Sequence, residues 1–140
     1  MRRIYLVLFA LASTLAACSS SDESAVEATV DDLVDALNDR DTASLARLFS
    51  DGSVAPVSPA GDSSVVYRLA TIPGGSGFEA GNIVATVIED RAQAQFDLAG
   101  SVERGDQVMG EMTMRVGLDL ERSGEQWRIV PGSDRMLSTW

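Results

Sequence analysis

The chain has 140 residues, of which 21 are acidic and 11 basic; every basic residue is Arg, and there is no Lys or His. The length fits one domain with one hydrophobic core. The formal net charge of −10 opposes nucleic-acid binding. Without His, and with a single Cys, the chain lacks the residues of Ser-His-Asp, Cys-His and zinc sites. We therefore expect no nucleic-acid partner, no metal and no cofactor.

The N-terminus has the layout of a secretory signal peptide, with an apolar run from Ile4 to Ala17 behind Arg2 and Arg3. The run is shorter than the roughly 20 apolar residues that a membrane span needs. It ends in Leu-Ala-Ala-Cys at residues 15–18, which resembles the bacterial lipobox, and Cys18 is the only cysteine. The resemblance implies that residues 1–17 are removed and that Cys18 receives a diacylglyceryl group. Two acyl chains hold a protein at a membrane where one chain is marginal.

We accordingly expect an exported protein, lipid-anchored at the extracytoplasmic face of the cell membrane. The alternatives are an ordinary secreted protein with a free Cys18, and twin-arginine export through Arg2 and Arg3 in place of the general secretory route. Processing would leave nine Arg against 21 acidic residues, a net charge of −12, and no disulfide. Residues 18–23 read as a flexible spacer and residues 24–140 as one domain.

Two helices are predicted at the start of this domain. Ser24 and Glu27 form a capping-box pattern, so a helix is expected to begin there. Its apolar stripe consists of Val26, Val30, Leu33, Val34 and Leu37, and its solvent face carries Glu27, Asp31 and Asp35. Asp41 is a candidate N-cap for a second helix over residues 42–49.

The rest of the chain predicts a meander of strands. Residues 50–64 contain two prolines and are predicted to form a loop, with at most a short extended piece at 54–57. The Gly-rich residues 73–77 are predicted to form a turn, because a phosphate-binding loop needs a Lys and the chain has none. Strands are expected at 65–70, 78–89, 91–102, 111–121 and 126–130, with Met136, Leu137 and Trp140 closing the core. The fold class is α+β, two N-terminal helices packed on a curved antiparallel sheet.

Three segments, 36–41, 45–49 and 120–129, resemble the nuclear transport factor 2-like superfamily, including its SnoaL-like members and small envelope lipoproteins. The resemblance spans residues 24–131 and implies a cone-shaped sheet around a long helix, with a pocket at one end. That superfamily contains isomerases, dehydratases and polyketide cyclases as well as non-catalytic binding and assembly modules. This chain departs from the enzymes because it has no catalytic His and because a proline-containing loop occupies 50–64, where a third helix often lies.

A binding module is the first functional hypothesis. Four of the five methionines fall in the domain, at positions 109, 112, 114 and 136. Methionine is flexible and polarisable, so a pocket around Met112, Met114 and Trp127 would suit an apolar or amphiphilic ligand. The alternative is that these side chains fill an irregular core, where Trp127 is expected in any case.

Two other hypotheses stay open. An isomerase or cyclase needs a carboxylate base and a hydrogen-bond donor in an apolar pocket. The candidates are Asp41 or Asp97 for the base and Tyr67 or Trp127 for the donor. An interaction module would use the exposed face of the sheet to form a homodimer or to dock on an envelope protein. That face is expected to carry Glu111, Thr113, Arg115, Asp119 and Glu121.

Overall fold

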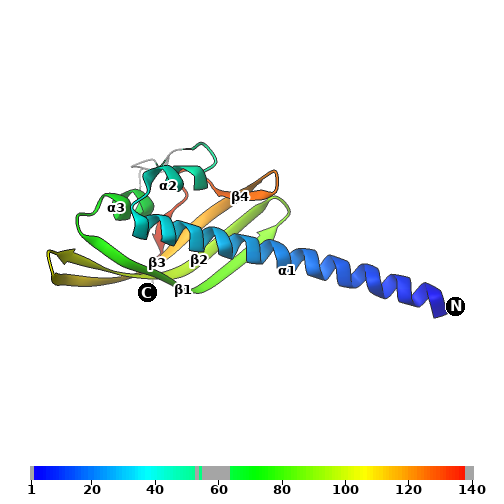
Figure 1. Cartoon of the computed structure of the whole chain (residues 1–140). Coiled ribbons are helices and arrows are strands. Elements are labelled where there is room, and N and C mark those ends of the chain that lie inside the picture. The colour runs from blue at the N-terminus through cyan, green and yellow to red at the C-terminus, as the bar shows by residue number, and fades with distance from the viewer. Residues whose placement is uncertain (1, 53, 55–63, 138–140) are drawn as a thin grey trace.

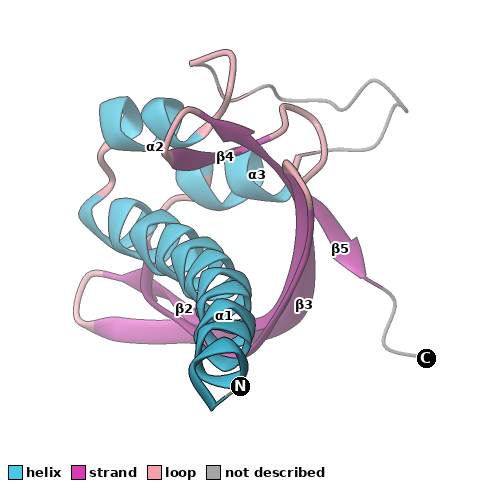
Figure 2. Cartoon of the chain, turned by 90° about the vertical axis from the view of Figure 1, so that its right-hand side faces the viewer, coloured by secondary structure: helices cyan, strands magenta, loops and turns pink. Residues whose placement is uncertain are grey.

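The long helix α1 (Arg2–Asp39) lies along the concave face of a curved antiparallel sheet, and its N-terminal part projects away from the domain (Figures 1 and 2). The computed structural model describes residues 2–52, 54 and 64–137, and for residues 2–20 the backbone alone. Among the helices of these residues, none is long and apolar enough to cross a membrane.

Two short helices and five strands complete the described elements. The helices are α2 (Thr42–Leu48) and α3 (Val65–Thr71). The strands are β1 (Gly75–Ile88), β2 (Arg91–Arg104), β3 (Gln107–Ser123), β4 (Gln126–Ile129) and β5 (Arg135–Leu137). The sheet order is β1-β2-β3-β4, and β5 pairs with β3. The predicted α+β class with a curved antiparallel sheet is confirmed, with a third helix added.

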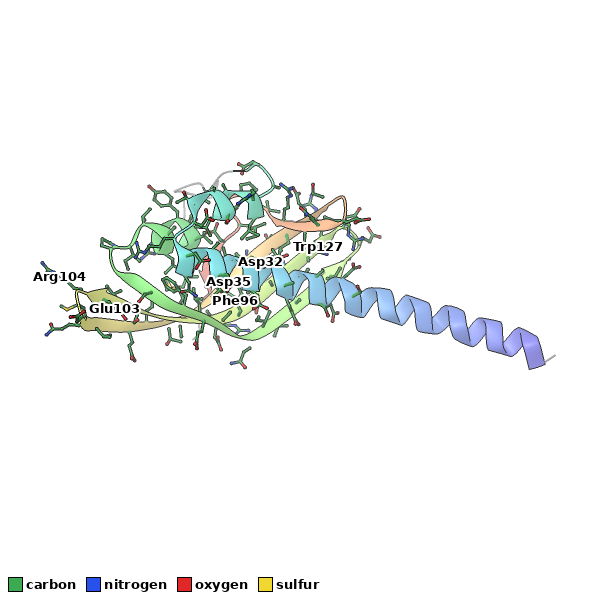
Figure 3. The ribbon with its side chains drawn as sticks, viewed as in Figure 1. Asp32, Asp35, Phe96, Glu103, Arg104 and Trp127 are labelled. Carbon is green, nitrogen blue, oxygen red and sulfur yellow. The ribbon has the colours of Figure 1, made fainter. Side chains whose placement is uncertain are left out.

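The apolar stripe of α1 forms the centre of the core. All five predicted stripe residues, from Val26 to Leu37, are buried, and they pack mainly against β1. Glu27, Asp31 and Asp35 on the opposite side are exposed. Figure 3 places Phe96 of β2 beneath the helix, and this side chain is fully buried. The predicted stripe and acidic solvent face of the helix are therefore confirmed.

Tight two-residue turns connect the four main strands. The flanking register pairs are Ile88 with Arg91, Arg104 with Gln107, and Ser123 with Gln126. Gly105 and Gly124 adopt positive φ angles of 65° and 66° in the second and third turns, where a residue with a Cβ would be strained. These short connections make every neighbouring pair antiparallel.

The pairing of β1 with β2 shifts register at two places. One such shift in β1 leaves Phe78 out of the register pairing with β2. Asn38 supplies the missing partners: its Oδ1 accepts from the Phe78 N–H at 2.7 Å, and its Nδ2 donates to the Phe78 carbonyl at 2.9 Å. The Phe78 ring in turn fills the space over Gly100, where a Cβ would lie 2.5 Å from the ring. The irregularity is thereby satisfied, and it fixes the end of α1 on the sheet.

The strand predicted at 65–70 is wrong, because these residues form α3. Val65, Val66 and Leu69 are buried on one side of that helix. Ser64 caps it, accepting from the Tyr67 N–H at 3.1 Å. The buried carboxylate of Asp134, 70 residues further along the chain, accepts from both the Ser64 hydroxyl and the Val66 N–H. The helix is thus specified by packing and by a distant cap, which outweigh the strand preference of the two valines.

Two other expectations differ from the structure, and two more fall largely outside the residues it describes. The helix does not begin at Ser24, because α1 continues from Arg2 through the predicted spacer at 18–23. Within that spacer, Asp22 pairs with Arg122 at 2.6 Å. Met136 does not close the core, since its residue surface is 56 % exposed. Trp140 and most of the extended piece expected at 54–57 lie outside the described residues.

Replacing Asp134 by Ala should destabilise the domain by about 1–3 kcal/mol, because the change leaves buried donors on Ser64 and Val66 without an acceptor. Chemical denaturation followed by circular dichroism measures the loss. The matched control is Asp106→Ala, in the exposed turn between β2 and β3, which should change the free energy of unfolding far less. Equal losses in both variants would contradict the assigned role of Asp134.

Candidate functional site

An apolar pocket of about 380 Å³ lies between α3, β3 and β5. Its lining residues are Val65, Arg68, Leu69, Thr71, Ile72, Met112, Met114 and Met136. We call it the methionine pocket. The volume falls in the lower part of the range of roughly 300–1,000 Å³ found for small-molecule sites.

The backbone explains why these side chains meet. Met112 and Met114 are two residues apart on β3, so both side chains lie on its concave face. In the register with β2, Met112 is paired with Gly100 and Met114 with Leu98. Leu69 of α3 is buried opposite them, and Met136 of β5 contributes an exposed edge. The pocket therefore has one wall whose backbone is fixed by the sheet, and the methionine side chains that line it are flexible.

Among the described residues that line the pocket, Arg68 alone is charged. Its guanidinium has no hydrogen-bond or ion-pair partner among the described residues, and the residue is exposed. The other polar lining residue, Thr71, already donates its hydroxyl to the Tyr67 carbonyl at 2.8 Å. The pocket thus combines an apolar interior with one uncommitted positive charge.

Of the three side chains expected around a pocket, Met112 and Met114 line the methionine pocket, whereas Trp127 lies elsewhere. Trp127 is a buried residue of β4, at the end of the domain away from the hairpin tip that carries Glu103 and Arg104 (Figure 3). The guanidinium of Arg122 lies 4.9 Å from the centre of its ring. The expected core role of Trp127 is confirmed, and Met109, which is 60 % exposed, does not line the pocket.

Asp41 and Asp97 have environments that favour the charged carboxylate. Asp41 is the exposed N-cap of α2, where hydrogen bonds from the side chain and then the backbone of Ser44 lower its pKa. Asp97 accepts from Asn82 at 2.8 Å and from Arg115 at 2.9 Å, and these bonds, in that order, lower its pKa. A general base of the isomerase type needs a raised pKa in an apolar pocket, and neither carboxylate has that setting.

The proposed base and donor residues are also separated. Tyr67 is 39 % exposed and lines a different hollow, between α2 and α3, and no carboxylate occurs among the lining residues that the structure describes there. Asp41 lies in an acidic hollow beside α1, together with Asp32, Asp35 and Asp39. Within the described part of the chain, no group of three or more Asp, Glu, Cys or His has a geometry that could hold a metal ion.

The outer face of the sheet carries the predicted polar row on β3, and its charges are largely paired within the chain. The pairs are Arg115 with Asp97 at 2.9 Å, Asp119 with Arg135 at 3.3 Å, and Glu121 with Arg91 at 3.9 Å. Glu111 and Thr113 are exposed. The expected mixed-sign surface is present as an ion-pair array.

Sequence reasoning missed the α3 side of the methionine pocket. Val65, Leu69 and Arg68 were assigned to a strand, so they were not considered as lining residues. A signal was present, because apolar residues at positions 65, 66 and 69 follow helical spacing directly after a Ser that can cap a helix.

Solved structures share this fold at low sequence identity. A protein of unknown function from Pseudomonas putida, described as NTF2-like, superposes with a TM-score of 0.64 at 20 % identity over 84 % of this chain and 87 % of that one. An NTF2-like protein with a cystatin-like fold from Novosphingobium aromaticivorans gives 0.63 at 15 % identity over 93 % and 90 %. A second protein from that organism, described provisionally as a scytalone dehydratase, gives 0.59 at 17 % identity over 84 % and 85 %.

No protein-family model matches the sequence, and no curated protein matches it. The structural likeness therefore establishes the fold, which is NTF2-like, as the resemblance of the three sequence segments implied.

Replacing Asp97 by Asn should destabilise the domain at neutral pH and have little effect in strong acid. The lowered pKa means that the Asp97 carboxylate stabilises the fold above the unfolded-state value of about 3.9 and loses this effect as pH falls through the lower folded-state value. Unfolding midpoints measured from pH 7 downward check this, with Asp106→Asn as the exposed control. A difference from the unsubstituted chain that did not shrink in acid would contradict the assignment.

Proposed function

We propose that the mature protein is held by lipid on Cys18 at the outer face of the cell membrane and that its domain binds a small apolar or amphiphilic ligand without chemical conversion. The observation that supports this most directly is the methionine pocket, which uses Met112, Met114 and Met136. Unbranched thioether side chains adapt to irregular apolar ligands at low cost, and binding surfaces of broad specificity use them for this reason.

The lining of the pocket favours binding over catalysis. Its described residues include no carboxylate, so none of them offers a bound ligand a carboxylate general base. One structural neighbour is described provisionally as a dehydratase. In this chain, however, the candidate carboxylates Asp41 and Asp97 lie outside the methionine pocket, and hydrogen bonds keep both of them charged.

The pocket also has better support than the sheet face as the site of function. The charged residues of β3 at positions 115, 119 and 121 have partners within the chain. A docking protein would have to displace or share these pairs, and exposed pairs of this type contribute little free energy. The methionine pocket, in contrast, is lined by apolar side chains and by Arg68, whose guanidinium has no hydrogen-bond or ion-pair partner among the described residues.

The position of Asp22 fits a short membrane attachment. Its ion pair with Arg122 holds the chain against the β3–β4 end of the sheet, four residues after Cys18. Four helical residues extend only about 6 Å. A lipid on Cys18 would therefore keep that end of the domain close to the membrane surface.

Cells that express the chain and are fed radiolabelled palmitate should incorporate the label into the protein, and Cys18→Ser should abolish the labelling. The thiol is the acceptor of the diacylglyceryl group, and Ser offers only a hydroxyl in its place. Ser20→Ala is the control and should retain full labelling. Labelled Cys18→Ser protein would refute the anchor, whether or not its signal peptide is cleaved.

The neutral fluorescent probe N-phenyl-1-naphthylamine should bind the full chain carrying Cys18→Ser, in which no acyl chain of the protein competes for the pocket. Met112→Trp should weaken this binding at least tenfold, because the larger side chain fills the cavity. Met109→Trp places the same ring on the exposed hairpin and should leave the affinity unchanged.

Circular dichroism would check that Met112→Trp folds. Met136→Asp provides a second test at an exposed position, where the substitution puts a charge at the pocket edge without disturbing the core. If both pocket variants bind the probe like the control, or the unsubstituted pocket binds none, the proposed site is wrong.

A further inference from the structure

We propose that the ligand of the methionine pocket is a single-chain amphiphile with one anionic head group, which the guanidinium of Arg68 binds at the pocket opening. This inference rests on the proposed binding function and adds the charge and the shape of the ligand. It is carried by the distribution of arginines and acids over the surface.

Most arginines in the described part of the domain have polar partners for their side chains. Seven of the nine form such contacts: Arg40, Arg47, Arg91, Arg115, Arg122, Arg128 and Arg135. Only Arg68 and Arg104 have none from described residues. Arg104 lies at the tip of the β2–β3 hairpin (Figure 3), whereas Arg68 lines the pocket.

No acid is found among the described residues that line the pocket, which is notable in a chain with 21 acidic residues. The hollow beside α1 is lined by four aspartates, and the hollow on the outer sheet face combines Arg91 with Asp119. Compared with three other hollows lined by described residues, the methionine pocket differs in having a cation without an acid among its described lining residues. A guanidinium so placed offers planar, paired donors that match a carboxylate or a phosphate.

The remaining lining residues define the other end of the ligand. Val65, Leu69 and Ile72 on one side and the methionines on the other offer only apolar contacts. Thr71 has its hydroxyl committed to backbone carbonyls. A volume of about 380 Å³ favours one hydrocarbon chain over the two chains of a diacyl lipid.

The test displaces N-phenyl-1-naphthylamine from the full Cys18→Ser chain with four compounds that share a dodecyl-length tail and are kept below their micelle concentrations. The compounds are dodecanoate, dodecyl phosphate, dodecan-1-ol and dodecyltrimethylammonium. Each anion should displace the probe at a concentration about tenfold lower than the alcohol, since a charge-assisted hydrogen bond adds to the shared apolar contacts. The order of the two anions distinguishes a carboxylate from a phosphate head group.

Arg68→Gln should remove the advantage of the anions and leave the affinity for the alcohol unchanged. Arg68→Lys should restore part of it, and Arg104→Gln, the matched control, should keep all of it. Equal binding of alcohol and anions, a preference for the cation, or a preference for the anions that survives Arg68→Gln would overturn the inference. Failure of the probe itself to bind would instead refute the proposed pocket function.

Discussion

The packing of α1 into the concave sheet is the constraint on which the rest of the domain depends. Burial of a Val or Leu side chain stabilises a fold by about 1.5–3 kcal/mol, and α1 buries such side chains at Val26, Val30, Leu33, Val34 and Leu37. The helix can lie there only because the sheet curves around it (Figure 2), and a register shift in β1, an irregularity that bends strands, lies beside the end of the helix. Asn38 links the helix to the sheet, because it follows the buried stripe of α1 and its side chain forms hydrogen bonds with the backbone N–H and carbonyl of Phe78 in the irregular part of β1.

The methionine pocket follows from the incomplete coverage of this sheet. α1 packs mainly on β1, so the face of β3 needs a second element to cover it. The second element is the seven-residue helix α3 (Figure 2). Its start is capped by Asp134 and Ser64. A helix this short leaves space beside Met112 and Met114, and β5 closes only one edge with Met136. The pocket is therefore the place where the curved sheet extends beyond its helical cover.

Local sequence patterns predicted the elements that are stabilised by their own periodicity. Alternation identified β2 and β3, and the stripe from Val26 to Leu37 identified the packed part of α1. Two consecutive valines at 65 and 66 suggested a strand, and the group that stabilises a helix there, Asp134, is remote in sequence. The α3 side of the pocket was lost for that reason, because a long-range cap leaves no local pattern.

The negative net charge of the domain opposes the anion binding that we assign to Arg68, and this opposition restricts which anions can bind. The processed chain would carry a net charge of −12, so its long-range field repels any anion that approaches. Physiological salt screens charges beyond about 8 Å, whereas a guanidinium in contact with a head group is screened much less. Salt therefore removes more of the distant repulsion than of the contact attraction. An anionic amphiphile would be held by one local pair in a generally repulsive field, which excludes anions that lack an apolar chain to bury among the methionines.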